Sequence, residues 1–283
     1  MTDVYGILGH PVGHSRSPAM HNRAFAVLGM DAVYVPFSVT PERLETAVRG
    51  VRALDLRGVN ITLPHKTTIM KWLDAIEPDA AAIGAINTVF RDGPKLRGTN
   101  TDAAGLARAL QEVEAPVQGA CATVLGAGGA ARACVVGLAR GGVERVKLAA
   151  RNAAQAELLV AQLAGVVKPA LLEVCAWESA PLTAALTVSD LLVQATSATL
   201  DAGEGGAAFA RALPLAALPT HAVVMDIVYS PLDTCVLKAA REHGKRTVDG
   251  LGMLLHQAIL SFELWTGRTA PLDEMRAALA ASS

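Results

Sequence analysis

Short apolar stretches recur along the chain at the length of buried strands, and stretches with helix signals separate most of them. Four lie in the first hundred residues, at 4–8, 32–39, 58–62 and 86–91. Five more follow, at 122–125, 146–150, 171–175, 191–195 and 222–227. Short apolar runs alternating with helices favour parallel sheets with helices on their faces. The pattern therefore predicts two α/β units.

Polar residues followed by proline mark two helix starts. Ser17-Pro18 and Thr40-Pro41 each place an N-cap residue before proline at the first helical position. Asp92-Gly93 predicts a turn after the fourth apolar stretch. The last forty residues predict two further helices, at 251–265 and from 271 onward. Whether these helices pack on the first unit is left open by the pattern.

Composition excludes several classes of protein. The chain has 283 residues, 52% hydrophobic and 18% charged, with a formal net charge of −1. This balance gives no electrostatic footprint for nucleic acid or anionic lipid. No signal peptide is evident at the N-terminus, and the longest uncharged stretch, 115–131, is too polar and glycine-rich to span a membrane. We expect a cytoplasmic protein.

The four cysteines show no metal-binding or disulfide pattern. They form no C-x-x-C pair and none lies at zinc-ligand spacing from a histidine. We expect buried thiols in a reducing compartment, and no metal.

A glycine-rich turn is the strongest single motif. The segment Gly126-Ala127-Gly128-Gly129-Ala130-Ala131 fits G-x-G-x-x-A, follows an apolar strand and opens an apolar helix. In this context the first glycine allows the tight turn and the second lets the backbone approach a pyrophosphate at the helix N-terminus. The motif predicts a dinucleotide site rather than a simple glycine-rich turn.

The residue after the next strand indicates whether the chain binds NAD or NADP. A fold that binds NAD usually carries Asp or Glu there, but this chain has Arg151 and no acid before Glu157. Because arginine pairs with a 2′-phosphate, we expect NADP, the alternative being a solvated surface arginine.

Polar motifs in the first hundred residues suggest a substrate site. Ser15 and Ser17 flank a helix N-terminus, which favours an anion. Ser17 alone is better explained as an N-cap, and Ser15 beside it makes the anion site an equally good explanation. Asn60 and Thr62 alternate at the end of a strand, the edge where ligands of α/β proteins bind, and Lys66 follows.

The proposed catalytic pair is Lys66 with Asp102. Taken singly, the lysine would be surface and the aspartate a helix-start acid. Reduction of a ketone by NADPH needs a proton donor, however, and a partly desolvated lysine held by a carboxylate can supply it. Lys66 and Asp102 could form such a pair in a dehydrogenase, although nothing in the residues alone places them in contact.

Together, and in this order, the motifs resemble the shikimate dehydrogenase family over nearly the whole chain. They are Gly9-His10-Pro11, Ser15-Arg16-Ser17-Pro18, the segments 60–66 and 84–88, Asn100-Thr101-Asp102, Gly126-Ala127-Gly128-Gly129-Ala130, Asp226-Ile227-Val228-Tyr229 and the segment 249–258. Any one of them is weak evidence, but their joint order is specific.

The resemblance implies a two-domain α/β fold. Residues 1–101 with 249–283 would form a split substrate-binding domain, and 102–248 a doubly wound, Rossmann-type NADP-binding domain. The implied reaction is the reversible NADPH-dependent reduction of 3-dehydroshikimate to shikimate in aromatic amino-acid biosynthesis. Expected partners are this small-molecule substrate and, as an assembly that the sequence leaves open, a second copy in a homodimer.

The resemblance also implies roles for individual residues. Lys66 would be the acid/base residue, oriented by Asp102. The expected substrate-binding residues are Ser15, Ser17, Asn60, Thr62, Lys66, Asn87, Asp102, Tyr229 and Gln257. The expected cofactor-binding residues are Gly126, Ala127, Gly128, Gly129, Ala130, Arg151, Asn152, Thr196, Ser197, Ile227, Gly250 and Met253.

Two departures from the family pattern keep alternatives open. Ala150-Arg151-Asn152 stands where the family usually has Asn-Arg-Thr, and Gln194 where it usually has Asn. A relative that also oxidises quinate, with NAD or with both cofactors, remains the first alternative. A non-catalytic NADP-binding protein is the second, and retention of both Lys66 and Asp102 argues against it.

Overall fold

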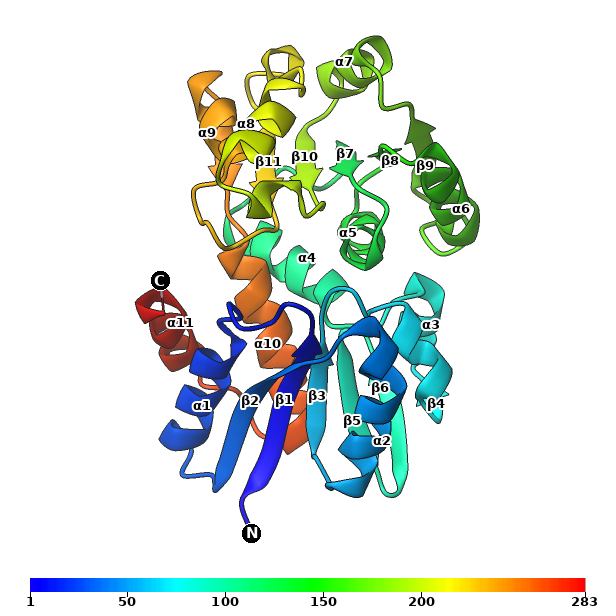
Figure 1. Ribbon diagram of the computed structural model, residues 1–283. Helices are drawn as coiled ribbons and strands as arrows, with labels where there is room; N and C mark the ends of the chain where they lie inside the picture. Colours follow the sequence, from blue (N-terminus) through cyan, green and yellow to red (C-terminus); the bar gives the residue numbers. More distant parts are fainter. Residues whose placement is uncertain (283) are drawn as a thin grey trace. The chain divides into compact units, whose positions relative to one another are not determined.

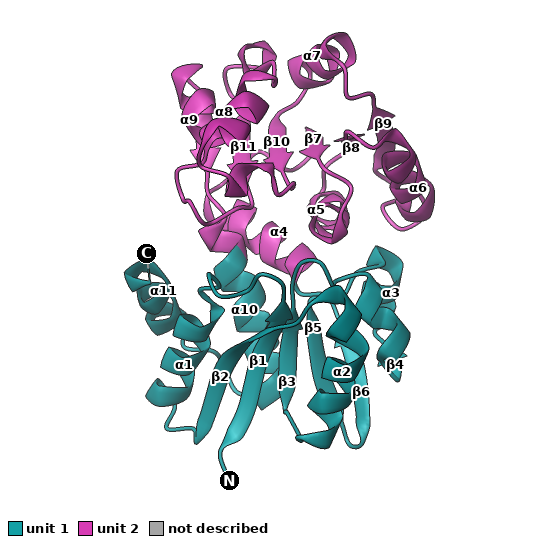
Figure 2. Cartoon of the chain, in the orientation of Figure 1, with its two compact units in different colours: residues 1–101, 254–283 teal, residues 102–253 magenta. Residues whose placement is uncertain are grey.

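The computed structural model describes residues 1–282, which form two compact units (Figures 1 and 2). Unit 1 contains Met1–Thr101 and the chain from Leu254 onward, and unit 2 contains Asp102–Met253. The second boundary lies inside helix α10 (Leu251–Thr266), a little after the position 249 expected from the sequence.

The sheet of unit 1 has the strand order β2-β1-β3-β5-β6-β4. Its strands are β1 (Asp3–Gly9), β2 (Ala32–Ser38), β3 (Gly58–Ile61), β4 (Ala75–Ile76), β5 (Thr88–Asp92) and β6 (Lys95–Thr99). β2, β1 and β3 are parallel, but β5 runs antiparallel to both of its neighbours. The parallel pairing that the alternation favours holds for β2, β1 and β3. β5 departs from it, and the turn at Asp92-Gly93 joins β5 to β6 as a hairpin with no room for a crossover helix.

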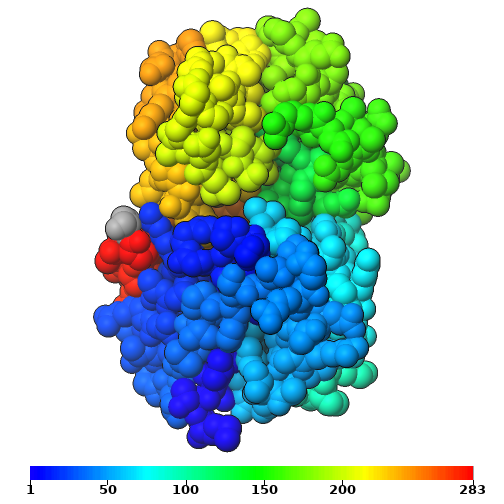
Figure 3. Space-filling model, viewed as in Figure 1, coloured from blue at the N-terminus to red at the C-terminus, as the bar shows by residue number. Residues whose placement is uncertain are grey.

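Helices cover both faces of this sheet. They are α1 (Ser17–Val27), α2 (Leu44–Ala53), α3 (Pro78–Ile83), most of α10, and α11 (Leu272–Ala281), with 3₁₀ turns at Pro41–Arg43 and Thr68–Trp72. Along β3, Val59 and Ile61 lie in the core with α2, whereas the side chain of Asn60 meets α10. The helices α1 and α11, which come from opposite ends of the chain, pack side by side (Figure 3).

The sheet of unit 2 is fully parallel, with the order β12-β11-β10-β7-β8-β9. Its strands are β7 (Cys121–Leu125), β8 (Arg145–Ala149), β9 (Leu171–Cys175), β10 (Leu191–Gln194), β11 (Val223–Asp226) and β12 (Arg246–Val248). Read from β9, this is the 3-2-1-4-5-6 order of dinucleotide-binding folds, with its switch point between β7 and β10. The doubly wound fold expected for this part of the chain is confirmed.

Unit 2 carries six helices in its described residues: α4 (Asp102–Glu112), α5 (Gly129–Arg140), α6 (Ala153–Leu163), α7 (Ser179–Thr187), α8 (Glu204–Arg211) and α9 (Cys235–Glu242). Short 3₁₀ turns occur at Ala198–Leu200 and Leu215–Ala217. Over residues 1–282, no helix is both long and apolar enough to cross a membrane.

Candidate active site

Ser15 and Ser17 lie together at the start of α1. The helix begins at Ser17, its N-cap position is Arg16, and no side chain caps it. The explanation of Ser17 as an N-cap is therefore wrong. Instead, the Ser15 Oγ accepts a hydrogen bond from the Ser17 N–H at 3.3 Å. The two residues thus stay adjacent at the N-terminal end of α1, where the helix dipole favours an anion.

The segment that carries Lys66 is tied to three other parts of unit 1. The Thr62 N–H donates to a carbonyl of β1 at 2.9 Å, and the Ile86 N–H donates to the Lys66 carbonyl at 2.7 Å. The buried ring of His65 donates from Nε2 to the Val39 carbonyl at 2.6 Å. Since a carbonyl can only accept, this contact fixes the proton on Nε2. The backbone around Lys66 is therefore held in place.

A buried cluster of amides and hydroxyls surrounds Asn87. Its Oδ1 accepts from the Thr101 N–H at 2.7 Å and from the Thr88 hydroxyl at 3.0 Å. Its Nδ2 donates to the Thr101 Oγ1 at 2.8 Å and, more weakly, to the Gln257 Oε1 at 3.4 Å. Because a backbone N–H can only donate, these contacts fix the orientation of the amide. Two expected substrate-binding residues, Asn87 and Gln257, are thus in contact.

Asn60 belongs to the same cluster, and its side-chain amide forms hydrogen bonds to other side chains of the protein. Its Oδ1 accepts from the Tyr34 hydroxyl at 2.7 Å, and its Nδ2 lies 3.2 Å from the Thr88 Oγ1 and 3.1 Å from the Ser261 Oγ. Only 4% of the residue is exposed. Sequence reasoning missed Tyr34 and Ser261, and it included Thr88 in a motif without giving it a role. For Ser261 a signal existed, because it follows Gln257 by one helical turn and so shares its face of α10.

The glycine-rich turn of unit 2 joins β7 to α5. Gly126 has a φ of +111°, and a Cβ there would lie 3.0 Å from the Thr196 Cγ2. At Gly128, the extended N-cap of α5, a Cβ would meet nothing within 4 Å. The turn is therefore tight on one side and open on the other, beside the N–H groups that begin α5. This arrangement fits a dinucleotide pyrophosphate.

Arg151 and Asn152, which follow β8, differ in exposure and in hydrogen bonding. Arg151 is exposed. Asn152 caps α6, because its Oδ1 accepts from the Gln155 N–H at 3.1 Å. Gln155 in turn donates from Nε2 to the Ala127 carbonyl at 3.1 Å, linking α6 to the glycine-rich turn. Sequence reasoning missed Gln155.

Two more segments expected near the cofactor are fixed by close contacts. A Cβ on Gly250 would lie 2.4 Å from the Ile227 carbonyl oxygen, so no larger residue fits without a shift of the backbone. Gln194 holds the Thr196 backbone on both sides, accepting from its N–H at 2.7 Å and donating to its carbonyl at 3.0 Å. The longer side chain of Gln194 is thus accommodated by bonds within its own loop.

The remaining expected residues are divided between the units. Lys66 belongs to unit 1, whereas Asp102 is the first residue of α4 in unit 2. Tyr229 follows β11, and Met253 is buried in α10. Within residues 1–282, no group of three or more His, Cys, Asp or Glu side chains is arranged to hold a metal ion.

Comparisons with known proteins point to one family. Residues 7–89 match the shikimate dehydrogenase substrate binding domain, and residues 250–280 match the shikimate 5′-dehydrogenase C-terminal domain. The chain is 46% identical over 282 residues to shikimate dehydrogenase (NADP(+)) from Symbiobacterium thermophilum, covering 98% of this chain and 94% of that protein.

Solved structures give the same result. Shikimate 5-dehydrogenase from Thermus thermophilus, in complex with NADP(H) and shikimate, matches with a TM-score of 0.85 and 35% identity over 100% of both chains. Quinate dehydrogenase from Corynebacterium glutamicum, in complex with NAD, matches with a TM-score of 0.88 and 28% identity over 99% of both. On this sequence identity, fold and site geometry, the chain belongs to the shikimate dehydrogenase family.

Proposed function

We propose that this chain catalyses the reversible reduction of 3-dehydroshikimate to shikimate with NADPH, as a step in aromatic amino-acid biosynthesis. One observation carries the proposal. A single chain combines the buried cluster around Asn87 with the glycine-rich turn at Gly126–Gly128 of a Rossmann-type sheet. Relatives named shikimate dehydrogenase (NADP(+)) are similar to it over almost their full length.

At the substrate end, Ser15 and Ser17 would hold the carboxylate at the N-terminus of α1, and Tyr229 would lie near it. Thr62, Asn87, Asp102 and Gln257 would bind the ring hydroxyls. Because the Asn87 Oδ1 already accepts from a backbone N–H, Asn87 would act toward the substrate as a donor through Nδ2. We assign Asn60 to support of this cluster rather than to substrate contact, since its amide is engaged by protein groups.

For the chemistry, Lys66 would give its proton to the developing alkoxide and take it back in the reverse direction. Asp102 would orient the ammonium and favour its charged form. A general acid of this kind contributes ~10²–10⁴-fold in rate. NADPH, when bound, supplies the hydride.

At the cofactor end, the backbone of Gly126, Ala127, Gly128, Gly129 and Ala130 would hold the pyrophosphate. Arg151 and the amide nitrogen of Asn152 would contact the 2′-phosphate, since the Oδ1 of Asn152 is used in capping α6. Thr196, Ser197, Ile227, Gly250 and Met253 would flank the nicotinamide.

Steady-state kinetics with shikimate and quinate, each against NADP and NAD, tests the function. We expect the highest kcat/KM for shikimate with NADP. A higher value for quinate with NAD would favour the second candidate, a quinate/shikimate dehydrogenase that uses NAD. The departure of Ala150-Arg151-Asn152 from the family's usual Asn-Arg-Thr supports that candidate on the cofactor side. No turnover with any pair would reject both.

Two substitutions test the roles. Lys66→Ala should abolish turnover while leaving shikimate binding largely intact, and near-normal turnover would reject its role as proton donor. Arg151→Ala should weaken NADP far more than NAD, whereas an equal loss for both would reject the 2′-phosphate assignment.

Location and assembly complete the proposal. We propose a cytoplasmic protein, because all four cysteines are unpaired, as is usual in a reducing compartment. We also propose a homodimer, which analytical ultracentrifugation would distinguish from a monomer.

A further inference from the structure

Unit 2 contains a second buried polar cluster, which the proposed chemistry does not use. Its members are Gln194, Thr199, Asp226 and Thr234, each with 0% exposure. Gln194 and Asp226 are the last residues of β10 and β11. Thr199 lies in the 3₁₀ turn after β10, and Thr234 is the N-cap of α9. The cluster therefore joins the loops that leave the carboxyl ends of two neighbouring strands.

Asp226 is the centre of this cluster. Its Oδ1 accepts from the Val228 N–H at 3.0 Å, from the Thr199 hydroxyl at 3.3 Å and from the Gln194 amide at 3.4 Å. Its Oδ2 accepts from the Thr234 hydroxyl at 2.8 Å. These four donors are neutral, and burial raises the pKa of Asp226 to about 6. Burying a carboxylate without a cation costs stability, so a purely stabilising role explains it poorly.

The same bonds fix the segments that we assign to the nicotinamide end of the cofactor. Gln194 holds Thr196 by its backbone N–H and carbonyl and also donates to the Thr199 Oγ1 at 2.9 Å. Asp226, through the Val228 N–H, closes a turn around Ile227. One carboxylate thus links the segments 196–197 and 227–229.

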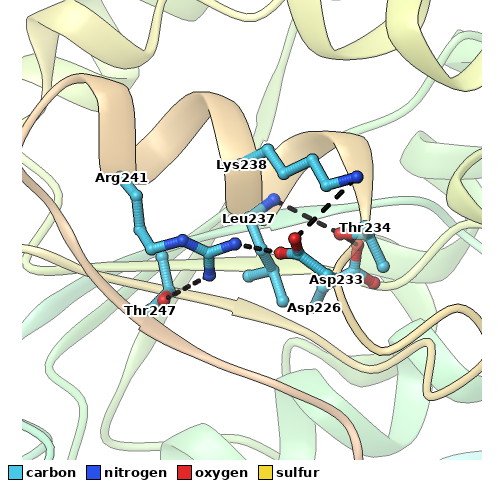
Figure 4. A network of polar contacts seen from close by, with 7 residues as sticks. All are labelled: Asp226, Asp233, Thr234, Leu237, Lys238, Arg241 and Thr247. Atoms are coloured by element: carbon cyan, nitrogen blue, oxygen red, sulfur yellow. Dashed lines mark hydrogen bonds and ion pairs between the residues drawn. The ribbon is translucent and has the colours of Figure 1, made fainter.

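The loop that continues from the segment 227–229 to α9 is also held where it meets α9 (Figure 4). The Thr234 Oγ1 accepts from the Leu237 N–H at 3.3 Å and so caps α9. Asp233, next to it, forms ion pairs with Lys238 at 3.8 Å and with Arg241. Arg241 also donates to the Thr247 hydroxyl on β12 at 3.1 Å. The loop from β11 to α9 is therefore held at both of its ends.

We propose that Asp226 is a positioning residue for hydride transfer, which together with Gln194 and Thr199 holds the segments 196–197 and 227–229 in one arrangement. The proposal rests on the proposed function. Loss of the link would disturb only the nicotinamide end, while the glycine-rich turn and Arg151 keep the rest of the cofactor bound. A misplacement of about 1 Å at a reacting centre costs on the order of 10²-fold in rate.

A matched pair of substitutions at Thr199 tests the proposed positioning role of the cluster. Thr199→Val keeps the shape and removes the hydroxyl, whereas Thr199→Ser keeps the hydroxyl. For Thr199→Val we expect kcat to fall roughly 10- to 100-fold, with the Kd for NADP⁺, measured by calorimetry, nearly unchanged. The primary isotope effect with 4-deuterated NADPH should rise, because hydride transfer becomes slower. Thr199→Ser should restore most of kcat.

Hydrogen exchange of the ligand-free protein gives a readout that is independent of activity. The amides of Thr196, Ala198 and Val228 should exchange faster in Thr199→Val than in Thr199→Ser. Equal exchange in both variants, an unchanged kcat, or a parallel loss of kcat and NADP⁺ affinity would each overturn the proposal. If the unsubstituted protein turns over no substrate, the proposed function fails, and the exchange rates still decide whether the cluster fixes these segments.

Discussion

His21 should make unit 1 sensitive to acid, and replacing it with leucine should remove that sensitivity. The side chain lies in α1 with 0% exposure, stacked on Tyr34 with ring centroids 4.4 Å apart. Phe25, Phe262 and Trp265 complete its surroundings. In the described part of the chain, neither ring nitrogen has a hydrogen-bond partner. Burial of this kind disfavours the charged form and lowers the pKa of His21 to about 3.

The size of the effect follows from the two pKa values. In the unfolded chain the pKa of a histidine is about 6.5, so between that pH and about 3 the unfolded state binds one more proton than the folded state. Stability is therefore lost as the pH falls through this window, at about 1.4 kcal/mol per pH unit. From pH 7 to 4.5 the loss comes to about 2.5 kcal/mol.

Urea unfolding measured by tryptophan fluorescence checks this value. In a Trp177→Phe background the two remaining tryptophans, Trp72 and Trp265, both report on unit 1. The free-energy difference between the unsubstituted protein and His21→Leu should change by about 2.5 kcal/mol between pH 7 and 4.5. Phe25→Leu, in the same aromatic cluster but without a titrating group, is the matched control and should show no such change. Parallel pH profiles for the protein with His21 and for His21→Leu would refute the reasoning.

Three further substitutions have definite expected outcomes. Tyr34→Phe removes the donor to the Asn60 Oδ1 and should cost about 1–3 kcal/mol of unfolding free energy in urea, because a buried acceptor loses its partner; an unchanged midpoint would contradict this. Gly58→Ala places a Cβ 2.2 Å from the Trp265 Nε1 and should cost about 1–3 kcal/mol in the same assay; an unchanged midpoint would show that this packing does not restrict position 58. Gly126→Ala combines a φ of +111° with a Cβ tightly packed on the next loop, and should weaken NADP⁺ binding measured by calorimetry; unaltered affinity would argue against the tight turn as part of the site.

The parallel core of the fold could be predicted from the sequence because its strands are continuous apolar runs. Three strands were not predicted because they are not continuous apolar runs. β4 has only two residues, β6 alternates buried positions with exposed or half-buried ones, and β12 is an edge strand with no fully buried residue. The hairpin at Asp92-Gly93 was visible as a turn, but its consequence, an antiparallel β5, depends on which strands pair, and pairing is not a local property.

In the site, too, features set by neighbouring residues could be predicted from the sequence, whereas contacts between distant residues could not. The glycine-rich turn could be predicted because its pattern is local, lying between a strand and a helix, and because Gly126 has the positive φ that favours glycine. The partners Tyr34 and Ser261 could not, since they reach Asn60 from distant positions in the sequence. Ser17 was misread for a related reason. A Ser-Pro pair fits an N-cap, but the structure places the helix start one residue earlier than that pattern requires.

Asn60 and Asn87 share one buried cluster, but we propose different roles for them toward the substrate. Both are buried amides of one cluster, but their bonds differ in strength. The Nδ2 of Asn60 has neighbours at 3.1 and 3.2 Å, and its Oδ1 holds a 2.7 Å bond from Tyr34. The Asn87–Gln257 bond, at 3.4 Å, is long and weak. A substrate hydroxyl can replace it at little cost, accepting from the Asn87 Nδ2 and donating to the Gln257 Oε1. This difference supports the proposal that Asn87 and Gln257 bind the substrate while Asn60 supports the cluster.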